Sequence, residues 1–253
     1  MLKGGPWELT VLPARGGRIT SLRLGGEELL EQGIGVDDPF ADGFVDGGAS
    51  GWDEMVPNVD ATDSLPDHGE AWRVPWSVGA KTHESVSMRC TGRVMPWELG
   101  RRIELGEGCV RVSYVYTNRG AVPQYAYWCA HPLFRFEHGM EIGVPGGDRL
   151  AQLAPGTSTK VFLPKGSIDR ARLGWRSGAA IEMAWDATLT PYVGVWVCNG
   201  DLGGYRQVAI EPATGGGGGP DQASPPPLLE PGEQFRWWLE VRDARWVGKG
   251  VWG

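Results

Sequence analysis

The sequence lacks the clusters of cysteine and histidine that hold metal ions or carry out thiol redox chemistry. Its four cysteines form no C-x-x-C pair, and its four histidines are dispersed along the chain. A zinc or redox motif would bring such residues together at short, regular spacing. We therefore expect reduced, mostly buried thiols and no metal site or redox motif. The positions concerned are Cys90, Cys109, Cys129, Cys198, His68, His83, His131 and His138.

Long apolar and strongly basic segments are lacking as well. No apolar stretch reaches the length that crosses a membrane, and the N-terminal residues contain no apolar core of a signal peptide. Asp and Glu outnumber Lys and Arg by 31 to 24, and no run of Lys and Arg forms a basic stripe. We expect a cytoplasmic protein that binds neither membranes nor nucleic acid.

Helical patterns are short, and the composition favours strands. No long segment repeats apolar residues with a clean period of 3.6. The 40 glycines and 19 prolines supply many turns, and the 13 tryptophans suit strands and carbohydrate-facing surfaces. These features predict one all-β unit of antiparallel strands.

Alternation of apolar and polar residues marks a series of strands. Residues 33–70 are rich in Gly, Asp and Pro with little periodicity, which predicts a long loop of the kind that is usually functional or disordered. The Gly- and Pro-rich residues 214–227 leave about one strand pair behind them, too little for a second core, so we interpret them as a surface loop within a single domain, residues 1–253. The predicted strands are 7–12, 18–24, 72–78, 85–92, 97–105, 110–118, 125–136, 180–185, 192–198, 207–210 and 234–242.

A histidine lies near a proline in one predicted strand, beside two tyrosines. Alternate residues of a strand share a face, so Tyr125, Tyr127, Cys129 and His131 point the same way. Pro132 cannot donate to a ladder, and pairing is expected to weaken directly after His131. Taken alone, this histidine is more simply explained as a partly buried structural residue.

A glutamate occupies a similar place in a later strand. Gln207, Ala209 and Glu211 share one face, and Pro212 is expected to interrupt the ladder directly after the acidic residue. On its own, this pattern is typical of a surface strand that ends in a solvated glutamate.

The predicted loop region carries a third polar group beside aromatic residues. Trp52, Asp53 and Glu54 adjoin one another, and His68 precedes a glycine. Carboxylates can bind sugar hydroxyls while an aromatic face stacks on the C–H surface of the ring, so these residues are candidates for a sugar pocket. The simpler interpretation is an acidic, solvated loop.

Five short segments, in order along the chain, resemble the galactose mutarotase-like (aldose 1-epimerase) superfamily. Ala-His-Pro-Leu-Phe, around His131, is similar to that family's His-Pro-Tyr-Phe signature, although Leu133 stands where an aromatic residue is usual. The segments around Glu211 and His68 resemble its glutamate and His-Gly motifs. The family's Asn-Arg sugar contact has no recognisable counterpart. The five segments are 16–22, 67–70, 130–134, 210–212 and 231–233 with Trp238.

This resemblance implies a large twisted antiparallel β-sandwich and an enzyme that interconverts the anomers of an aldose without a cofactor. It implies Glu211 as the general base, His131 as the general acid and His68 as a residue that binds a sugar hydroxyl. The expected partner is a small-molecule sugar. The remaining pocket residues would be Trp52, Asp53 and Glu54.

Other functions stay open at this point. A non-catalytic sugar-binding protein of the same fold would need no acid–base pair. A glycoside-processing enzyme would use two carboxylates, such as Glu211 with Asp53 or Glu54. A phosphosugar epimerase would need arginines at the pocket rim, for which Arg73 and Arg206 are candidates.

Overall fold

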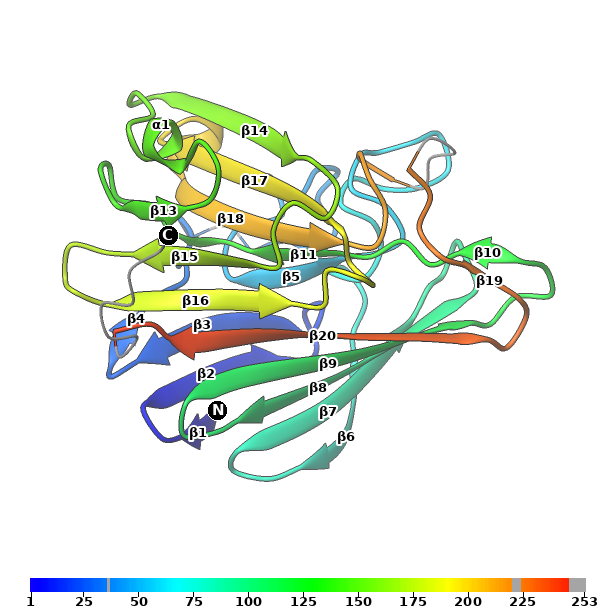
Figure 1. Ribbon diagram of the computed structural model, residues 1–253. Coiled ribbons are helices and arrows are strands. Elements are labelled where there is room, and N and C mark those ends of the chain that lie inside the picture. The colour runs from blue at the N-terminus through cyan, green and yellow to red at the C-terminus, as the bar shows by residue number, and fades with distance from the viewer. Residues whose placement is uncertain (36, 220–223, 246–253) are drawn as a thin grey trace.

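The computed structural model describes residues 1–35, 37–219 and 224–245. In it, two large antiparallel sheets pack against each other (Figure 1). Within these residues, one sheet has ten strands and the other eight. The predicted all-β sandwich is therefore confirmed. The ten-stranded sheet contains β1 (Leu2–Gly4), β2 (Trp7–Leu12), β3 (Arg18–Leu24), β4 (Glu27–Glu28), β5 (Trp52–Met55), β11 (Cys129–Pro132), β12 (Phe134–Arg135), β14 (Thr157–Leu163), β17 (Tyr192–Asn199) and β18 (Arg206–Ala213).

The second sheet lies across the first, and short elements complete the fold (Figure 1). The second sheet contains β6 (Ser77–Lys81), β7 (Ser85–Thr91), β8 (Trp97–Leu105), β9 (Cys109–Asn118), β13 (Glu141–Gly143), β15 (Arg170–Gly174), β16 (Ala180–Trp185) and β20 (Gln234–Asp243). The short elements are the β10 (Gln124–Tyr125) and β19 (Leu228–Leu229) pair, α1 (Gly147–Ala151) and the 3-10 turn Leu202–Gly204. No helix in the described ranges is long and apolar enough to span a membrane.

Most predicted strands are present, and the differences have local causes. The expected strand 72–78 is mostly a turn region with buried tryptophans, and β6 begins only at Ser77. The expected strand 125–136 is divided into β10, β11 and β12. Pro132 pairs with Trp52 and is the last residue of β11, so that ladder ends just after His131. Pro212 does not interrupt its ladder, which continues through Pro212 and Val193 to Ala213 and Tyr192. Seven strands were not predicted from the sequence; the longer ones are β5, β14 and β15, and the short ones are β1, β4, β13 and β19.

One hydrophobic core lies between the sheets because each turns alternate side chains inward. On β9, Val110, Val112 and Tyr114 are buried in this core, and Trp7 of β2 reaches it from the other sheet. Trp52 of β5 is also fully buried there. Because one face of each strand packs into this core, only the opposite face can contribute side chains to a site.

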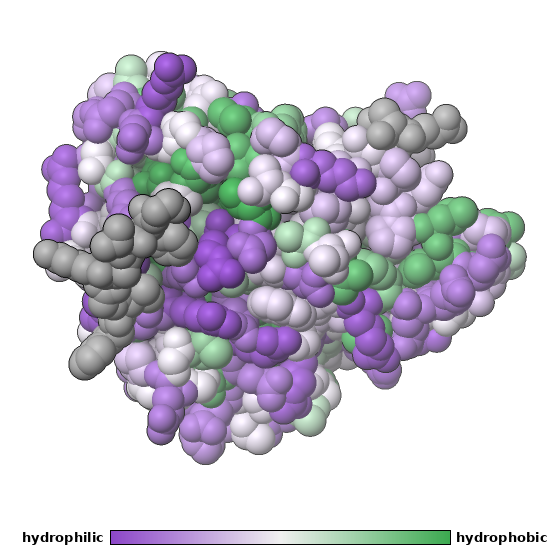
Figure 2. All heavy atoms as spheres, in the orientation of Figure 1, coloured by the Kyte–Doolittle hydropathy of each residue, from purple (hydrophilic) through white to green (hydrophobic). Residues whose placement is uncertain are grey.

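An apolar tip projects from the sandwich where β10 pairs with β19. Figure 2 shows hydrophobic surface at this tip, and Val122 and Leu228 are 66% and 55% exposed.

The Gly-rich part of the predicted surface loop, up to Gly219, is described, whereas Pro220 and residues 221–223 lie outside the described residues, as do 246–253.

A buried ion pair joins the two sheets. Arg101 of β8 donates from Nη1 to Oε1 of Glu54 on β5, at 2.8 Å. Tyr114 donates its hydroxyl to the same oxygen at 2.9 Å, and Trp128 donates Nε1–H to Oε2 at 2.8 Å. Burial raises the pKa of Glu54, and the Arg101 guanidinium opposes that rise. Glu54 therefore belongs to the core, where its partners saturate both of its oxygens.

Replacing Arg101 by Met is expected to destabilise the fold strongly. The change leaves the Glu54 carboxyl in the core without its cation, and breaking a buried pair in this way costs about 3–5 kcal/mol. Urea unfolding gives the free energy of unfolding directly.

Arg102 on the same strand is the matched control. Its partner is Glu104, and both side chains are 44% exposed, so Arg102→Met is expected to change the free energy of unfolding little. Equal losses in the two variants would contradict the role given to the buried pair.

Candidate active site

The candidate site lies on one face of the ten-stranded sheet, where strand register aligns residues that are distant in sequence. β18 pairs with β11 through Ala213 and Cys129, and with β12 through Val208 and Phe134. Both pairs define the same register. In that register His131 lies opposite Glu211.

The alignment extends across further strands. His131 faces Asp53 of β5, and Glu211 faces Gly194 of β17. Asp53 in turn accepts a hydrogen bond from Arg18 of β3 at 2.9 Å. Directly opposed residues share a face of a sheet. We refer to Arg18, Asp53, His131, Glu211 and Gly194 as the cross-strand row.

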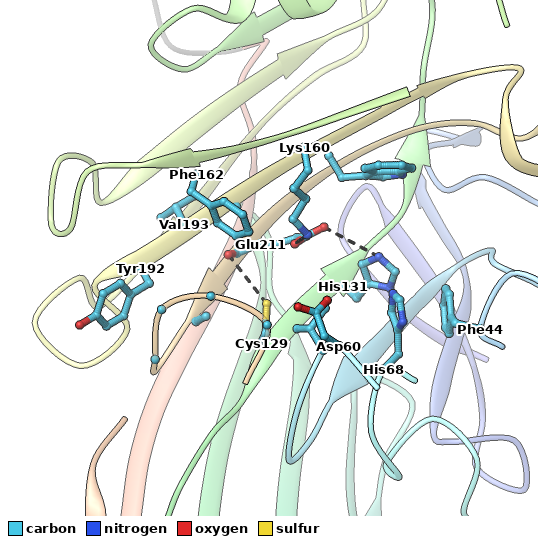
Figure 3. A pocket seen from close by; sticks show the side chains of 18 of the residues that line it. Phe44, Asp60, His68, Cys129, His131, Lys160, Phe162, Tyr192, Val193 and Glu211 are labelled. Carbon is cyan, nitrogen blue, oxygen red and sulfur yellow. Dashed lines mark hydrogen bonds and ion pairs between the residues drawn. The ribbon is translucent and has the colours of Figure 1, made fainter. Parts of the chain in front are cut away.

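The two predicted catalytic residues lie together in the wall of a cavity of about 660 Å³ (Figure 3). Nε2 of His131 is 3.8 Å from Oε1 of Glu211. His131 is 5% exposed and Glu211 is 1% exposed. Neither Nδ1 of His131 nor Oε1 of Glu211 has a hydrogen-bond partner among the described residues. In the cavity wall, the pair therefore leaves one carboxylate oxygen, Oε1, and one ring nitrogen, Nδ1, without a hydrogen-bond partner in the described part of the chain.

Burial sets the protonation state of His131. Removal from water holds the pKa of its imidazole well below the ordinary 6.5, and the positive charges of nearby groups, including Lys160 and Arg18, add to the effect. In the protein without substrate, the imidazole is therefore neutral near neutral pH.

Lys160 was not singled out from the sequence, although it contacts the predicted base. It comes from β14, and its Nζ donates to Oε2 of Glu211. Burial acts to lower the pKa of Lys160, but the charge of Glu211, its hydrogen bond and smaller contributions from Cys129 and Asp60 together outweigh burial, and the pKa is raised. The segment Thr-Ser-Thr-Lys-Val-Phe-Leu is rich in strand-forming residues, and this was the signal available.

His68 reaches the cavity from the loop after β5. Its backbone has φ 58°, in the left-handed region that few non-glycine residues adopt. Nδ1 lies 2.8 Å from Oδ1 of Asp67, and the ring stacks on Phe44 at 4.4 Å. The His68 and His131 rings are 5.1 Å apart. Asp67 thus orients His68 so that Nε2 is available to a ligand.

Asp67 is held as an anion by this contact. Burial acts to raise the pKa of its carboxyl, but the hydrogen bond from His68 and the charge of that ring contribute to a net lowering. Its second oxygen accepts a hydrogen bond from the backbone N–H of Phe44 at 2.8 Å. One carboxylate therefore fixes both members of the His68–Phe44 stack.

Three predicted sugar-pocket residues do not line the cavity. Trp52 lies in the core between the sheets, and Glu54 is saturated by the partners described above. Asp53 is 1% exposed and pairs with Arg18, its neighbour in the row, so it does not reach the cavity. The prediction for these residues was wrong because β5 is a central strand buried on both faces, which a sequence rich in polar residues did not indicate.

The proposed pairing of Glu211 with Asp53 or Glu54 for glycoside cleavage loses its basis for the same reason. Arg73 and Arg206, the candidate phosphate ligands, are not among the residues that line the cavity either. Arg73 instead lies over the Trp72 ring and donates to the Asp42 carbonyl.

The Gly-rich segment predicted as a surface loop forms part of the cavity wall. Residues 215–218 line it, and the hydroxyl of Tyr127 donates to the Gly217 carbonyl at 2.8 Å. A Cβ at Gly218 would lie 1.8 Å from Oδ2 of Asp60, so a larger residue there would displace the Asp60 side chain. The run of glycines therefore permits close approach to the loop after β5.

The chemistry available at this site is proton transfer. A free carboxylate oxygen, a neutral imidazole and a lysine ammonium meet at one wall of the cavity. In the part of the chain that the structure describes, no three His, Cys, Asp or Glu side chains are grouped as ligands for a metal ion.

Solved structures with this architecture are numerous, although their sequences are distant. The Slr1438 protein from Synechocystis sp. PCC 6803 superposes with a TM-score of 0.76 and 16% identity, over 94% of this chain and 92% of that one. A galactose mutarotase-like protein from Lactobacillus casei gives 0.72 and 17%, over 95% and 98%. The GalM/aldose epimerase homologue from C. elegans gives 0.64 and 11%, over 95% and 97%.

No protein-family model matches the sequence, and comparison with curated proteins finds no similar sequence. The likeness therefore concerns three-dimensional structure. Superposition over nearly the whole chain gives this protein the galactose mutarotase-like fold, and the predicted resemblance is confirmed at the level of fold.

Proposed function

We propose that the protein is an aldose 1-epimerase, which interconverts the α and β anomers of a sugar. The observation that carries this proposal is the His131–Glu211 pair, with 3.8 Å between Nε2 and Oε1 in the wall of one cavity. His68 adds a third polar group, and Phe162, Tyr192 and other aromatic residues line the same cavity, where they can stack on a sugar ring.

The proposed step moves one proton onto the ring oxygen and another off the C1 hydroxyl. Oε1 of Glu211 takes the hydroxyl proton, the C1–ring-oxygen bond breaks, and protonated His131 gives its proton to the ring oxygen. The products are the open-chain aldehyde, a neutral carboxyl and a neutral imidazole. Rotation about C1–C2 and the reverse transfers close the ring on the other face.

The acid in this step is the imidazolium form of His131. The imidazole is neutral in the free protein near neutral pH, so the reactive form carries one extra proton. Glu211 across the row from His131 stabilises that form by its negative charge.

Replacing Glu211 by Gln is expected to slow anomer exchange by about 10²–10⁴-fold, because it removes the base and keeps the shape of the side chain. Saturation-transfer NMR across a panel of free aldoses measures the exchange. Glu104→Gln, on β8 of the other sheet, makes the same chemical change at a 44% exposed side chain and is expected to keep the wild-type rate. Unchanged exchange in folded Glu211→Gln would remove Glu211 from the mechanism.

Replacing His131 and His68 by Asn separates their roles. His131→Asn is expected to lower the turnover number by a factor similar to that of Glu211→Gln, since it removes the proton donor. His68→Asn is expected to raise KM more than it lowers kcat, because the proposed role of His68 is contact with a hydroxyl.

A binding protein without activity would show sugar binding and no exchange in the wild type. Cleavage of a chromogenic glycoside would instead indicate a glycosidase.

The pH dependence should reflect the lowered pKa of His131. Since the acid must be protonated, kcat/KM is expected to fall as the pH rises through that pKa, which places the alkaline limb below the ordinary histidine value of about 6.5. Rates of anomer exchange between pH 4.5 and 8, corrected for the uncatalysed reaction, measure the limb. A rate that rises with pH through this range would contradict His131 as the acid.

A further inference from the structure

Lys160 contacts the proposed base, Glu211, although the two residues do not lie on neighbouring strands. It lies on β14, an end strand, whereas Glu211 lies on β18, and β17 runs between them. Its ammonium nevertheless donates to Oε2 of Glu211 (Figure 3). The contact therefore passes over an entire strand.

Gly194 of β17 makes this contact possible. It lies directly opposite Glu211. A Cβ at this position would be 2.9 Å from Oε2 of Glu211 and 3.0 Å from Cε of Lys160. Both distances are at or below the shortest approach that side chains make, so any larger residue would push the two groups apart. Because Gly194 has no side chain, the Lys160 side chain can cross β17 and pair with Glu211.

The groups around Glu211 leave it with one close counter-charge among the described residues. Burial raises the pKa of Cys129 and of Tyr127, so both of these neighbours stay uncharged. His131 is neutral in the free protein. Asp60, from the loop after β5, is a further acidic group near Lys160. The ammonium of Lys160 thus offsets the charge that burial of Glu211 makes costly.

The ion pair also fixes how the carboxylate is turned. Oε2 is occupied by Lys160, and Oε1 is left without a partner, 3.8 Å from Nε2 of His131. A carboxylate held at one oxygen presents the other in a defined direction.

We propose that Lys160 is a positioning residue for the reaction: its ammonium is the counter-charge of the buried Glu211 carboxylate and, by holding Oε2, turns Oε1 toward His131 and the substrate. This inference rests on the proposed epimerase function. Lys160 acts through Glu211 and needs no contact of its own with the reacting atoms.

The first test compares Lys160→Met with Lys160→Arg in the full-length protein. Without the ammonium, a buried carboxylate takes up a proton at higher pH, so the acid limb of kcat in Lys160→Met is expected to move up by about 1–3 pH units. At the new optimum, the misdirected carboxylate is expected to lower kcat by up to about 10²-fold. Lys160→Arg retains a cation and should keep the limb near its wild-type position.

Gly194→Ala tests the same geometry with both charges present. The added methyl group separates Lys160 from Glu211, so the acid limb is expected to move in the same direction as in Lys160→Met. Lys165→Met is the matched control: this lysine lines the same cavity but lies over the Tyr192 ring, 5.1 Å from its centroid, and its acid limb should not move. If Lys160→Met does not fold, Gly194→Ala and Lys160→Arg still decide the outcome.

A readout that needs no catalysis keeps the two proposals distinguishable. The titration of the Glu211 side-chain carboxyl carbon, followed by ¹³C NMR and assigned with Glu211→Gln, is expected to have a higher midpoint in Lys160→Met than in the wild type. An unchanged midpoint and acid limb in folded Lys160→Met, or faster exchange than in the wild type, would overturn the role of Lys160. Absence of exchange in the wild type with a shifted midpoint would overturn the epimerase proposal alone.

Discussion

The register between β11 and β18 is the constraint on which the site depends. His131 and Glu211 are 80 residues apart in sequence, yet the pairing of Cys129 with Ala213 places them side by side on one face. Because side chains alternate along a strand, a slip of one residue would turn one of them into the core between the sheets. Val208 and Ile210, which pack into that core from the other face of β18, hold the register in place.

Buried carboxylates in this protein differ in how completely they are satisfied. Glu54 receives donors on both oxygens and joins the two sheets. Glu211 receives Lys160 on one oxygen and keeps the other free beside a cavity. The same physical requirement, a cation beside a buried carboxylate, thus produces a structural link in one case and a reactive group in the other. What separates them is one unfilled acceptor next to His131.

The sequence predicts the parts of the site that depend on alternation within a strand. The faces assigned to His131 and Glu211 agree with the structure, since both line the cavity while Trp128 and Ile210 lie in the core. Resemblance to a known family added His68. Period-2 patterning cannot show which strands are central, however, and Asp53 was therefore placed in the pocket, although it is buried, pairs with Arg18 and does not line the cavity.

The contribution of Lys160 could not be predicted because it depends on pairing between strands. Its strand follows a helix and a turn, and nothing local to residues 157–163 indicates which neighbour β14 will take. The same holds for Gly194, whose lack of a side chain has meaning only once Glu211 and Lys160 are known to lie on either side of it. Long-range register, which no sequence window contains, decides such contacts.

The central claim is that a sugar binds with its anomeric carbon between His131 and Glu211. A crystal structure of the Glu211→Gln variant with an aldose that exchanges fastest in the wild type would test this most directly. The account predicts the C1 hydroxyl within about 2.6–3.2 Å of the side chain at position 211 and the ring oxygen at a similar distance from Nε2 of His131. A sugar bound in the cavity with C1 turned away from both residues would contradict it.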